Sequence, residues 1–176
     1  MAIVLFTDYG ANTVYPGQVE LALECLAPGV RVVHLMHEAP EFNVKAGAHL
    51  LAAQVASVPA GHVWITVVDP GVGGSRRALA LHAGGNWFTG PDNGLVSVVV
   101  ARARAAGQAV RIWQLARMPQ GIAASFHGRD VFAPLAASIA TGRFPGEDVL
   151  EVDGLEVDFG AGDLAEVIHV DGFGMR

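Results

Sequence analysis

Val63-Trp64-Ile65-Thr66-Val67-Val68, followed by Asp69-Pro70-Gly71-Val72-Gly73-Gly74-Ser75-Arg76, is the stretch of the chain that decides its fold. The first half is apolar and largely β-branched, a pattern that predicts a strand buried on both faces. Asp69 ends this strand, and its carboxylate is costly to desolvate unless a cation pairs with it. Arg76 is the nearest candidate. Because ligands bind at the carboxyl ends of strands in open α/β sheets, the stretch predicts a site as well as a strand.

Two other segments repeat this pattern. Residues 3–6 form an apolar run that leads to Asp8, and residues 30–36 form another that leads to His37. If these strands are parallel neighbours of the first, Asp8, His37 and Asp69 lie at one edge of the sheet. A single aspartate after a strand is ordinarily a turn former or a helix cap. Acidic residues after two successive strands favour a binding or catalytic site over this alternative.

Strand and helix patterns alternate along the chain, which predicts an α/β fold with a central, mostly parallel sheet flanked by helices. The expected strands are 3–6, 30–36, 63–68, 78–82, 86–89 and 110–115. The expected helices are 15–26, 43–57 with Asn43 as N-cap, one after residues 91–94 that ends near 106, and one from about 127 to 141.

The character of the chain changes after residue 142. Residues 143–164 are acidic and contain glycine without a clear period, which is typical of a linker or extended arm. Residues 165–170 read as one more strand. A lone strand cannot fold independently. It therefore either joins the main sheet or belongs to a second domain that this chain lacks.

Composition excludes several classes of function. The chain has 176 residues, is 52% hydrophobic and carries a net charge of −6. The absence of a basic stripe argues against nucleic-acid binding. Its apolar runs are shorter than the about 20 residues that span a bilayer, and no basic region precedes the first one, so neither a membrane protein nor a signal peptide is expected. Cys25, the single cysteine, is expected in the core and predicts a reducing, cytoplasmic location.

Residues 125–130, Ser-Phe-His-Gly-Arg-Asp, form the strongest catalytic candidate outside the strands. The ordinary pKa of about 6.5 makes a histidine a suitable base at neutral pH. The alternative is that His127 only hydrogen-bonds the backbone at a helix start. His34 and His37 are three apart on a predicted strand, so they are expected on opposite faces and form a poor metal pair. No metal site is predicted.

Four motifs, in this order and spacing, resemble those of one enzyme family over nearly the whole chain. The family is the S-adenosyl-L-methionine (SAM) hydroxide adenosyltransferases, SAM hydrolases that form adenosine and methionine and are related to the fluorinase and chlorinase. The motifs are Phe6-Thr7-Asp8-Tyr9-Gly10, Asp69-Pro70-Gly71-Val72-Gly73, Pro91-Asp92-Asn93-Gly94-Leu95 and Phe126-His127-Gly128-Arg129-Asp130.

The resemblance implies an Asp–Arg–His set that positions and activates water. In this chain it falls on Asp69, Arg76 and His127, because Arg76 rather than Arg77 lies at the family's distance from the aspartate. Asp8 matches the acid that binds the ribose hydroxyls. A carboxylate suits this role because its two oxygens can accept from both hydroxyls of a diol.

The remaining substrate contacts are also implied by the resemblance. Phe42 falls where the halogenating relatives carry a tryptophan beside the nucleoside, and Ser125 and Phe126 would line the nucleophile pocket. Gly128 replaces the serine that holds halide in the fluorinase, and Asp69 replaces its tyrosine. Both differences favour water over halide.

Family members continue into a C-terminal β-barrel domain, which opens with Asp-x-Phe-Gly-Asn. Here Asp171 and Phe173 match and are expected ligand contacts, whereas Met175 stands in place of the asparagine. The expected organisation is therefore an α/β nucleoside-binding catalytic domain over 1–142, an arm over 143–164 and the first strand of a truncated domain over 165–176. The resemblance also implies a homotrimer.

The expected function is hydrolysis of SAM to adenosine and L-methionine without a metal or cofactor, SAM or adenosine being the only small-molecule partner. The sequence leaves open whether Asp69 or His127 takes the proton from water. Two alternatives stand beside this function: a halide-using SAM adenosyltransferase, and an inactive SAM- or adenosine-binding module.

Overall fold

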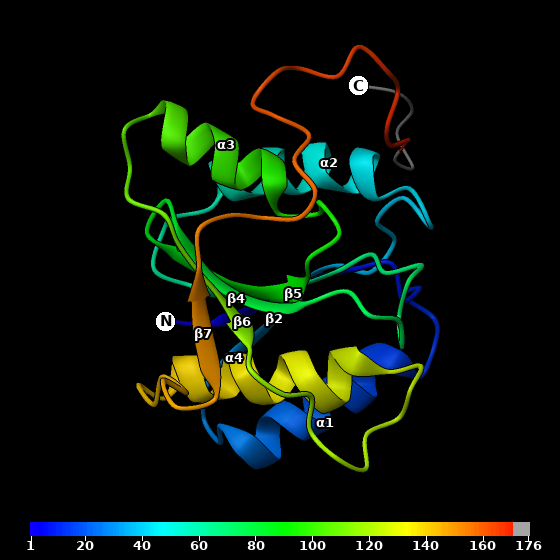
Figure 1. The fold of residues 1–176 in the computed structure, drawn as a ribbon. Coiled ribbons are helices and arrows are strands. Elements are labelled where there is room, and N and C mark those ends of the chain that lie inside the picture. The colour runs from blue at the N-terminus through cyan, green and yellow to red at the C-terminus, as the bar shows by residue number, and fades with distance from the viewer. Residues whose placement is uncertain (171–176) are drawn as a thin grey trace.

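A seven-stranded sheet runs through the middle of the protein, with a pair of helices on each face (Figure 1). The computed structural model describes residues 1–170. One face is covered by α1 (Tyr15–Leu26) and α4 (Ala133–Ala140), and the other by α2 (Val44–Ser57) and α3 (Ser97–Ala105). The predicted α/β architecture is confirmed.

The strand order is β2-β1-β3-β5-β4-β6-β7. The first four strands in this order are parallel to their neighbours, and the other three pair antiparallel, which makes the sheet mixed but mostly parallel in direction. The strands are β1 (Ile3–Thr7), β2 (Val32–Met36), β3 (Val63–Val67), β4 (Ala78–Ala83), β5 (Asn86–Pro91), β6 (Arg111–Leu115) and β7 (Val149–Val152).

Local sequence explains most of these elements. Every residue of β1 and β3 is buried, because helices cover both faces of the sheet, and this burial requires the continuous apolar runs seen in the sequence. Asn43 caps α2 as predicted: its Oδ1 accepts a hydrogen bond from the Ala46 amide at 3.1 Å.

The helix expected to start near residue 127 begins differently. Gly128–Phe132 forms one turn of π-helix, in which the Ala133 amide donates to the Gly128 carbonyl, and α4 follows it directly. Such turns are rare and occur frequently at functional sites. The widened turn lies directly after the buried His127 side chain.

The structure corrects the prediction for the region after residue 142. Residues 149–152, expected to be part of a linker, form β7 and pair antiparallel with β6. The run, Val-Leu-Glu-Val, is too short to show a strand period. The strand expected over 165–170 is absent: these residues have no regular secondary structure, and β7 already occupies the edge of β6. The domain boundaries stay a prediction.

Two smaller expectations were also wrong. The His34 and His37 rings are hydrogen-bonded, with 2.7 Å between Nδ1 and Nε2, because a β-bulge between β1 and β2 changes which face each side chain occupies. Cys25 is exposed rather than in the core. It lies two residues after the buried Leu23 and so on another side of α1.

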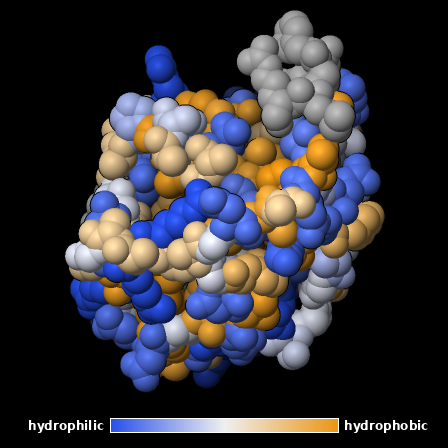
Figure 2. Space-filling model, turned by 90° about the horizontal axis from the view of Figure 1, so that it is seen from above, coloured by the Kyte–Doolittle hydropathy of each residue, from blue (hydrophilic) through white to orange (hydrophobic). Residues whose placement is uncertain are grey.

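The face formed by α2, α3 and the C-terminal arm is seen from above in Figure 2. Hydrophobic residues, drawn orange, lie among hydrophilic blue ones across this face. Within residues 1–170, no helix is both long and apolar enough to cross a membrane.

Candidate active site

Asp8 and Asp69 lie at the carboxyl edge of the sheet, as predicted. They follow the neighbouring strands β1 and β3, in which Thr7 pairs with Val67. The Asp8 amide donates to the Val67 carbonyl at 3.1 Å, which extends this pairing past the end of β1. Both aspartates line one cavity of about 100 Å³, together with Ser125, Phe126, His127 and Gly128. Segments distant in sequence thus meet around one small space.

Asp69, Arg76 and His127 form a continuous hydrogen-bonded chain. Arg76 Nε donates to Asp69 Oδ1 at 2.9 Å and to Oδ2 at 2.8 Å, and Arg76 Nη2 also contacts Oδ2. The same Nη2 lies 3.1 Å from His127 Nδ1. The Asp69 side chain is 3% exposed and that of Arg76 10%. The structure therefore brings the three predicted catalytic side chains together, away from bulk water.

The contact with Arg76 determines how His127 is protonated. A guanidinium has donors only, so His127 Nδ1 accepts, and in the neutral ring the proton sits on Nε2. Burial, followed by the positive charge of Arg76, lowers the pKa of His127 below its ordinary value of 6.5. The imidazole is therefore neutral at physiological pH, with its Nδ1 lone pair already used.

Two features hold the loop after β3 in place. Gly73 has a φ of +79°, and a Cβ there would lie 2.7 Å from the Ala124 carbonyl oxygen, so only glycine fits between the two loops. Asn93, after β5, donates from Nδ2 to the Val68 carbonyl at 2.8 Å and accepts from the Leu95 amide. These contacts fix the backbone on both sides of Asp69.

The motif over residues 91–95, besides holding the loop after β3, also binds the C-terminal arm. Asp92 is fully buried and pairs with Arg77, whose Nε lies 2.7 Å from Asp92 Oδ2 and whose Nη2 donates to the Gly154 carbonyl at 2.9 Å. The Glu156 amide donates to the same carboxylate. We call these four residues the Arg77–Asp92 clasp, because they hold the C-terminal arm against the domain.

The pKa of Asp8 is raised from 3.8 to about 6. Burial is the largest cause, and the negative charges of Asp69 and Glu41 add to it. A group with such a shift in a cavity is a functional-site candidate. A ligand with several hydroxyl groups would lower this pKa again, because hydrogen bonds from the hydroxyls stabilise the carboxylate.

Tyr9 is a site residue that the sequence analysis did not single out. It lines the same cavity as Asp69 and His127, and its ring packs edge-on against Phe126 with 5.6 Å between centroids. Its Oη is buried without a hydrogen-bond partner among the described residues. A Cβ on residue 128 would lie 2.8 Å from Tyr9 Cζ and overlap Oη, so Gly128 leaves the room that this phenol fills. Its signal in the sequence was its place beside Asp8 in the motif over residues 6–10.

Other predicted residues lie elsewhere. Phe42 is 75% exposed, has a φ of +56° and is not part of the cavity wall. His37 reaches the same sheet edge but bonds Thr7 Oγ1 at 2.7 Å instead of facing the cavity. Asp171 and Phe173 fall outside the described residues. Their roles in binding stay predictions.

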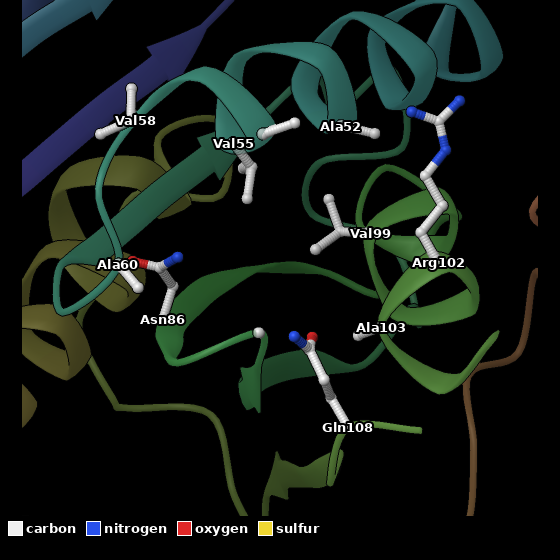
Figure 3. A pocket seen from close by; sticks show the side chains of 11 residues that line it. Ala52, Val55, Val58, Ala60, Asn86, Val99, Arg102, Ala103 and Gln108 are labelled. Atoms are coloured by element: carbon white, nitrogen blue, oxygen red, sulfur yellow. The ribbon is translucent and has the colours of Figure 1, made fainter. Parts of the chain in front are cut away.

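A second cavity, of about 280 Å³, lies between α2 and α3 and shares no residue with the first (Figure 3). Its wall is mainly small and aliphatic, with Val55 and Val99 facing each other and Arg102 and Gln108 at its border. It holds no carboxylate or imidazole. Within residues 1–170, no three His, Cys, Asp or Glu side chains are placed to hold a metal ion.

Comparison with known proteins places this chain among members of one family. Residues 3–149 match the family model of the SAM hydroxide adenosyltransferase N-terminal domain. A protein of Salinispora arenicola named (R)-S-adenosyl-L-methionine hydrolase is 40% identical, over 96% of this chain and 67% of its own length. A protein of the same name from Salinispora tropica is 41% identical, over 77% of this chain and 52% of its own.

The fold has solved relatives too. An uncharacterized conserved protein from Thermotoga maritima superposes with a TM-score of 0.83 and 29% identity, over 97% of this chain and 69% of its own. The chain spans about half to two thirds of the length of the curated relatives it matches. Matching over most of its residues, it belongs to the SAM hydroxide adenosyltransferase family.

Proposed function

We propose that the protein hydrolyses SAM to adenosine and L-methionine. The observation that carries this proposal is the buried Asp69–Arg76–His127 chain at the wall of a cavity of about 100 Å³. A cavity of this volume can hold a few water molecules. The hydrolase names of the relatives support the same reaction.

The proposed reaction is a displacement at the 5′ carbon of SAM. The water oxygen forms a bond to C5′ while the C5′–S bond breaks, and its electron pair stays on sulfur, which leaves as the neutral thioether of methionine. The leaving group therefore needs no acid. Only the water must lose a proton, and holding it in line with the C–S bond supplies a large part of the acceleration.

We assign the proton acceptor to Asp69. His127 Nδ1 already accepts from Arg76, and His127 Nε2 carries a hydrogen, so the neutral ring has no free lone pair in this arrangement. The Asp69 carboxylate retains lone pairs beyond those that Arg76 uses. His127 instead positions Arg76, whose charge stabilises the developing hydroxide.

Substrate binding is proposed as follows. Asp8 accepts hydrogen bonds from both ribose hydroxyls, while Ser125 and Phe126 border the space next to the reacting carbon. Phe42, Asp171 and Phe173 contact the nucleoside or the methionine.

The deciding experiment is incubation of the protein with SAM in H₂¹⁸O. Adenosine that carries ¹⁸O at the 5′ position, with an equal amount of methionine, is expected. The expected reaction needs no metal or cofactor, so EDTA should leave the rate unchanged. Chloride is added in a parallel reaction. If 5′-chloro-5′-deoxyadenosine is the main product, the protein is a halide-using adenosyltransferase rather than a hydrolase. If SAM binds but no product forms, the protein is an inactive binding module.

We also propose a homotrimer that acts in the cytoplasm on the cellular SAM pool. Family resemblance supports the trimer, and the exposed ring of Phe42 is apolar surface that a neighbouring subunit would cover. Light scattering after gel filtration tests it. A mass of one chain at micromolar concentration would contradict the trimer.

A further inference from the structure

Three buried side-chain polar atoms among the described residues have no hydrogen-bond partner, and two of them belong to the candidate active site. These two are Tyr9 Oη and Arg76 Nη1. The third, Trp64 Nε1, belongs to a fully buried core side chain. A buried donor or acceptor without a partner is destabilising. Of these two groups, Tyr9 lines the cavity, so its unsatisfied hydroxyl points to a ligand or water that satisfies it.

Tyr9 is held where its hydroxyl can serve this purpose. Its ring is fixed by edge-on packing against Phe126, with an angle of 75° between the planes. Its Oη lies over the backbone of Gly128, another residue of the cavity wall. Burial and the negative charges of Asp8 and Asp69 raise the pKa of Tyr9, so the phenol stays protonated and neutral at every physiological pH.

We propose that the Tyr9 hydroxyl binds the water that attacks SAM, and thus determines which nucleophile the site uses. This inference rests on the proposed function. The water donates one hydrogen to Asp69 and the other to Tyr9 Oη, while one of its lone pairs accepts from the free Arg76 Nη1. The remaining lone pair then faces the 5′ carbon. Tyr9 adds the second acceptor that fixes this orientation.

The packing of Tyr9 on Gly128 also bears on the choice of nucleophile. Any side chain at residue 128 would overlap Tyr9 Oη, so a serine there and the phenol in its present place exclude each other. With the phenol in place, the site offers Tyr9 Oη as a hydrogen-bond acceptor as well as donors such as Arg76 Nη1. A water molecule can donate to the first and accept from the second, whereas a halide ion can only accept hydrogen bonds.

The sharpest test uses adenosine, because its 5′ oxygen is the oxygen of the attacking water after reaction. Binding of adenosine and of 5′-deoxyadenosine, which lacks this oxygen, is measured by calorimetry for the wild type and Tyr9→Phe. We expect the variant to bind adenosine about tenfold more weakly and 5′-deoxyadenosine equally well, since one hydrogen bond is lost. A role in packing alone would change both affinities alike, and that result would overturn the proposal.

Turnover provides the second readout. Tyr9→Phe should lower kcat about 10- to 100-fold with little change in KM, and its melting temperature without ligand should not fall, because the lost hydroxyl has no protein partner. Tyr15→Phe is the matched control: its ring contacts Tyr9 and Phe126 and is 46% exposed. Tyr15→Phe should keep the wild-type kcat.

The outcomes separate the two proposals. An active wild type with an equally active Tyr9→Phe variant refutes the role of Tyr9 and leaves SAM hydrolysis in place. Equal losses in both tyrosine variants, or a loss of kcat with a matching loss of stability, also refute it. A wild type that forms no adenosine, together with unchanged adenosine affinity in Tyr9→Phe, refutes both.

Discussion

At the residue scale, Asp69 and His127 share the guanidinium of Arg76 but differ in what they have left to offer. The carboxylate has free lone pairs, whereas the imidazole has already used its acceptor nitrogen. Asp69→Asn should therefore lower kcat by about 10²–10⁴-fold, the usual contribution of a general base. His127→Gln keeps an acceptor for Arg76 and should lose less. Rates of adenosine release decide this, and the reverse order of the two losses would make His127 the base.

The same histidine should limit activity on the acid side. Protonation of His127 places a hydrogen on Nδ1 and removes the acceptor that faces Arg76. Because burial and Arg76 lower the pKa of His127, this loss should occur below pH 6.5. A profile of kcat between pH 4.5 and 8 should be flat at neutral pH and fall only in the acid range. An acid limb centred above pH 6.5 would contradict the assignment.

Asp8 should give stability and ligand binding opposite pH dependences. Its pKa is about 6 in the folded protein and 3.8 without the fold, so its contribution to stability is full below 3.8 and is lost as pH rises through about 6. Adenosine binding should strengthen over the same range, because the carboxylate is the acceptor. Urea unfolding and calorimetry compare the wild type with Asp8→Asn, in which both trends should disappear. Parallel trends in the two proteins would show that other groups cause them.

At the scale of elements, the Arg77–Asp92 clasp joins the C-terminal arm to the sheet. Arg77→Ala leaves the fully buried Asp92 without its cation, which should cost about 3 kcal/mol of unfolding free energy. Hydrogen exchange over residues 153–160 should rise. Arg111→Ala is the control, since the Arg111–Glu151 pair is exposed and should contribute little. Equal effects of the two substitutions would mean that the clasp does not hold the arm.

Elements that depend on local sequence could be predicted, and those that depend on neighbours could not. The strand ending at Asp69 and the cap at Asn43 follow from residues next to each other. The His34–His37 contact depends on a bulge in the pairing of β1 with β2, which no period in the sequence reveals. β7 is a strand only because the free edge of β6 is available to it.

The candidate site divides in the same way. Asp69 and His127 could be predicted because each stands in a recognisable motif, and Arg76 because of its distance along the chain from Asp69; the fold brings the three together. Tyr9 could not be singled out, because its importance comes from packing against Gly128, far along the chain. An unsatisfied hydroxyl is a property of the folded molecule and has no signature in sequence.

At the scale of the whole molecule, ligand binding and folding are linked. A ligand that binds only the folded state at 100 times its Kd adds about 2.7 kcal/mol to the free energy of unfolding. Adenosine should therefore raise the melting temperature of the wild type in a concentration-dependent way. Asp8→Asn should show a smaller rise at the same adenosine concentration. An identical rise in the two proteins would place the nucleoside elsewhere on the molecule.

Arg76 and Arg77 are consecutive, yet one guanidinium binds Asp69 at the reaction cavity and the other binds the C-terminal arm. The backbone of these two residues thus connects the Asp69–Arg76 pair of the candidate active site to the C-terminal arm. If the arm is pulled away, Arg77 follows it and the range of positions open to Arg76 widens. We therefore expect turnover to slow when the arm detaches, while every group that touches the nucleoside stays unchanged.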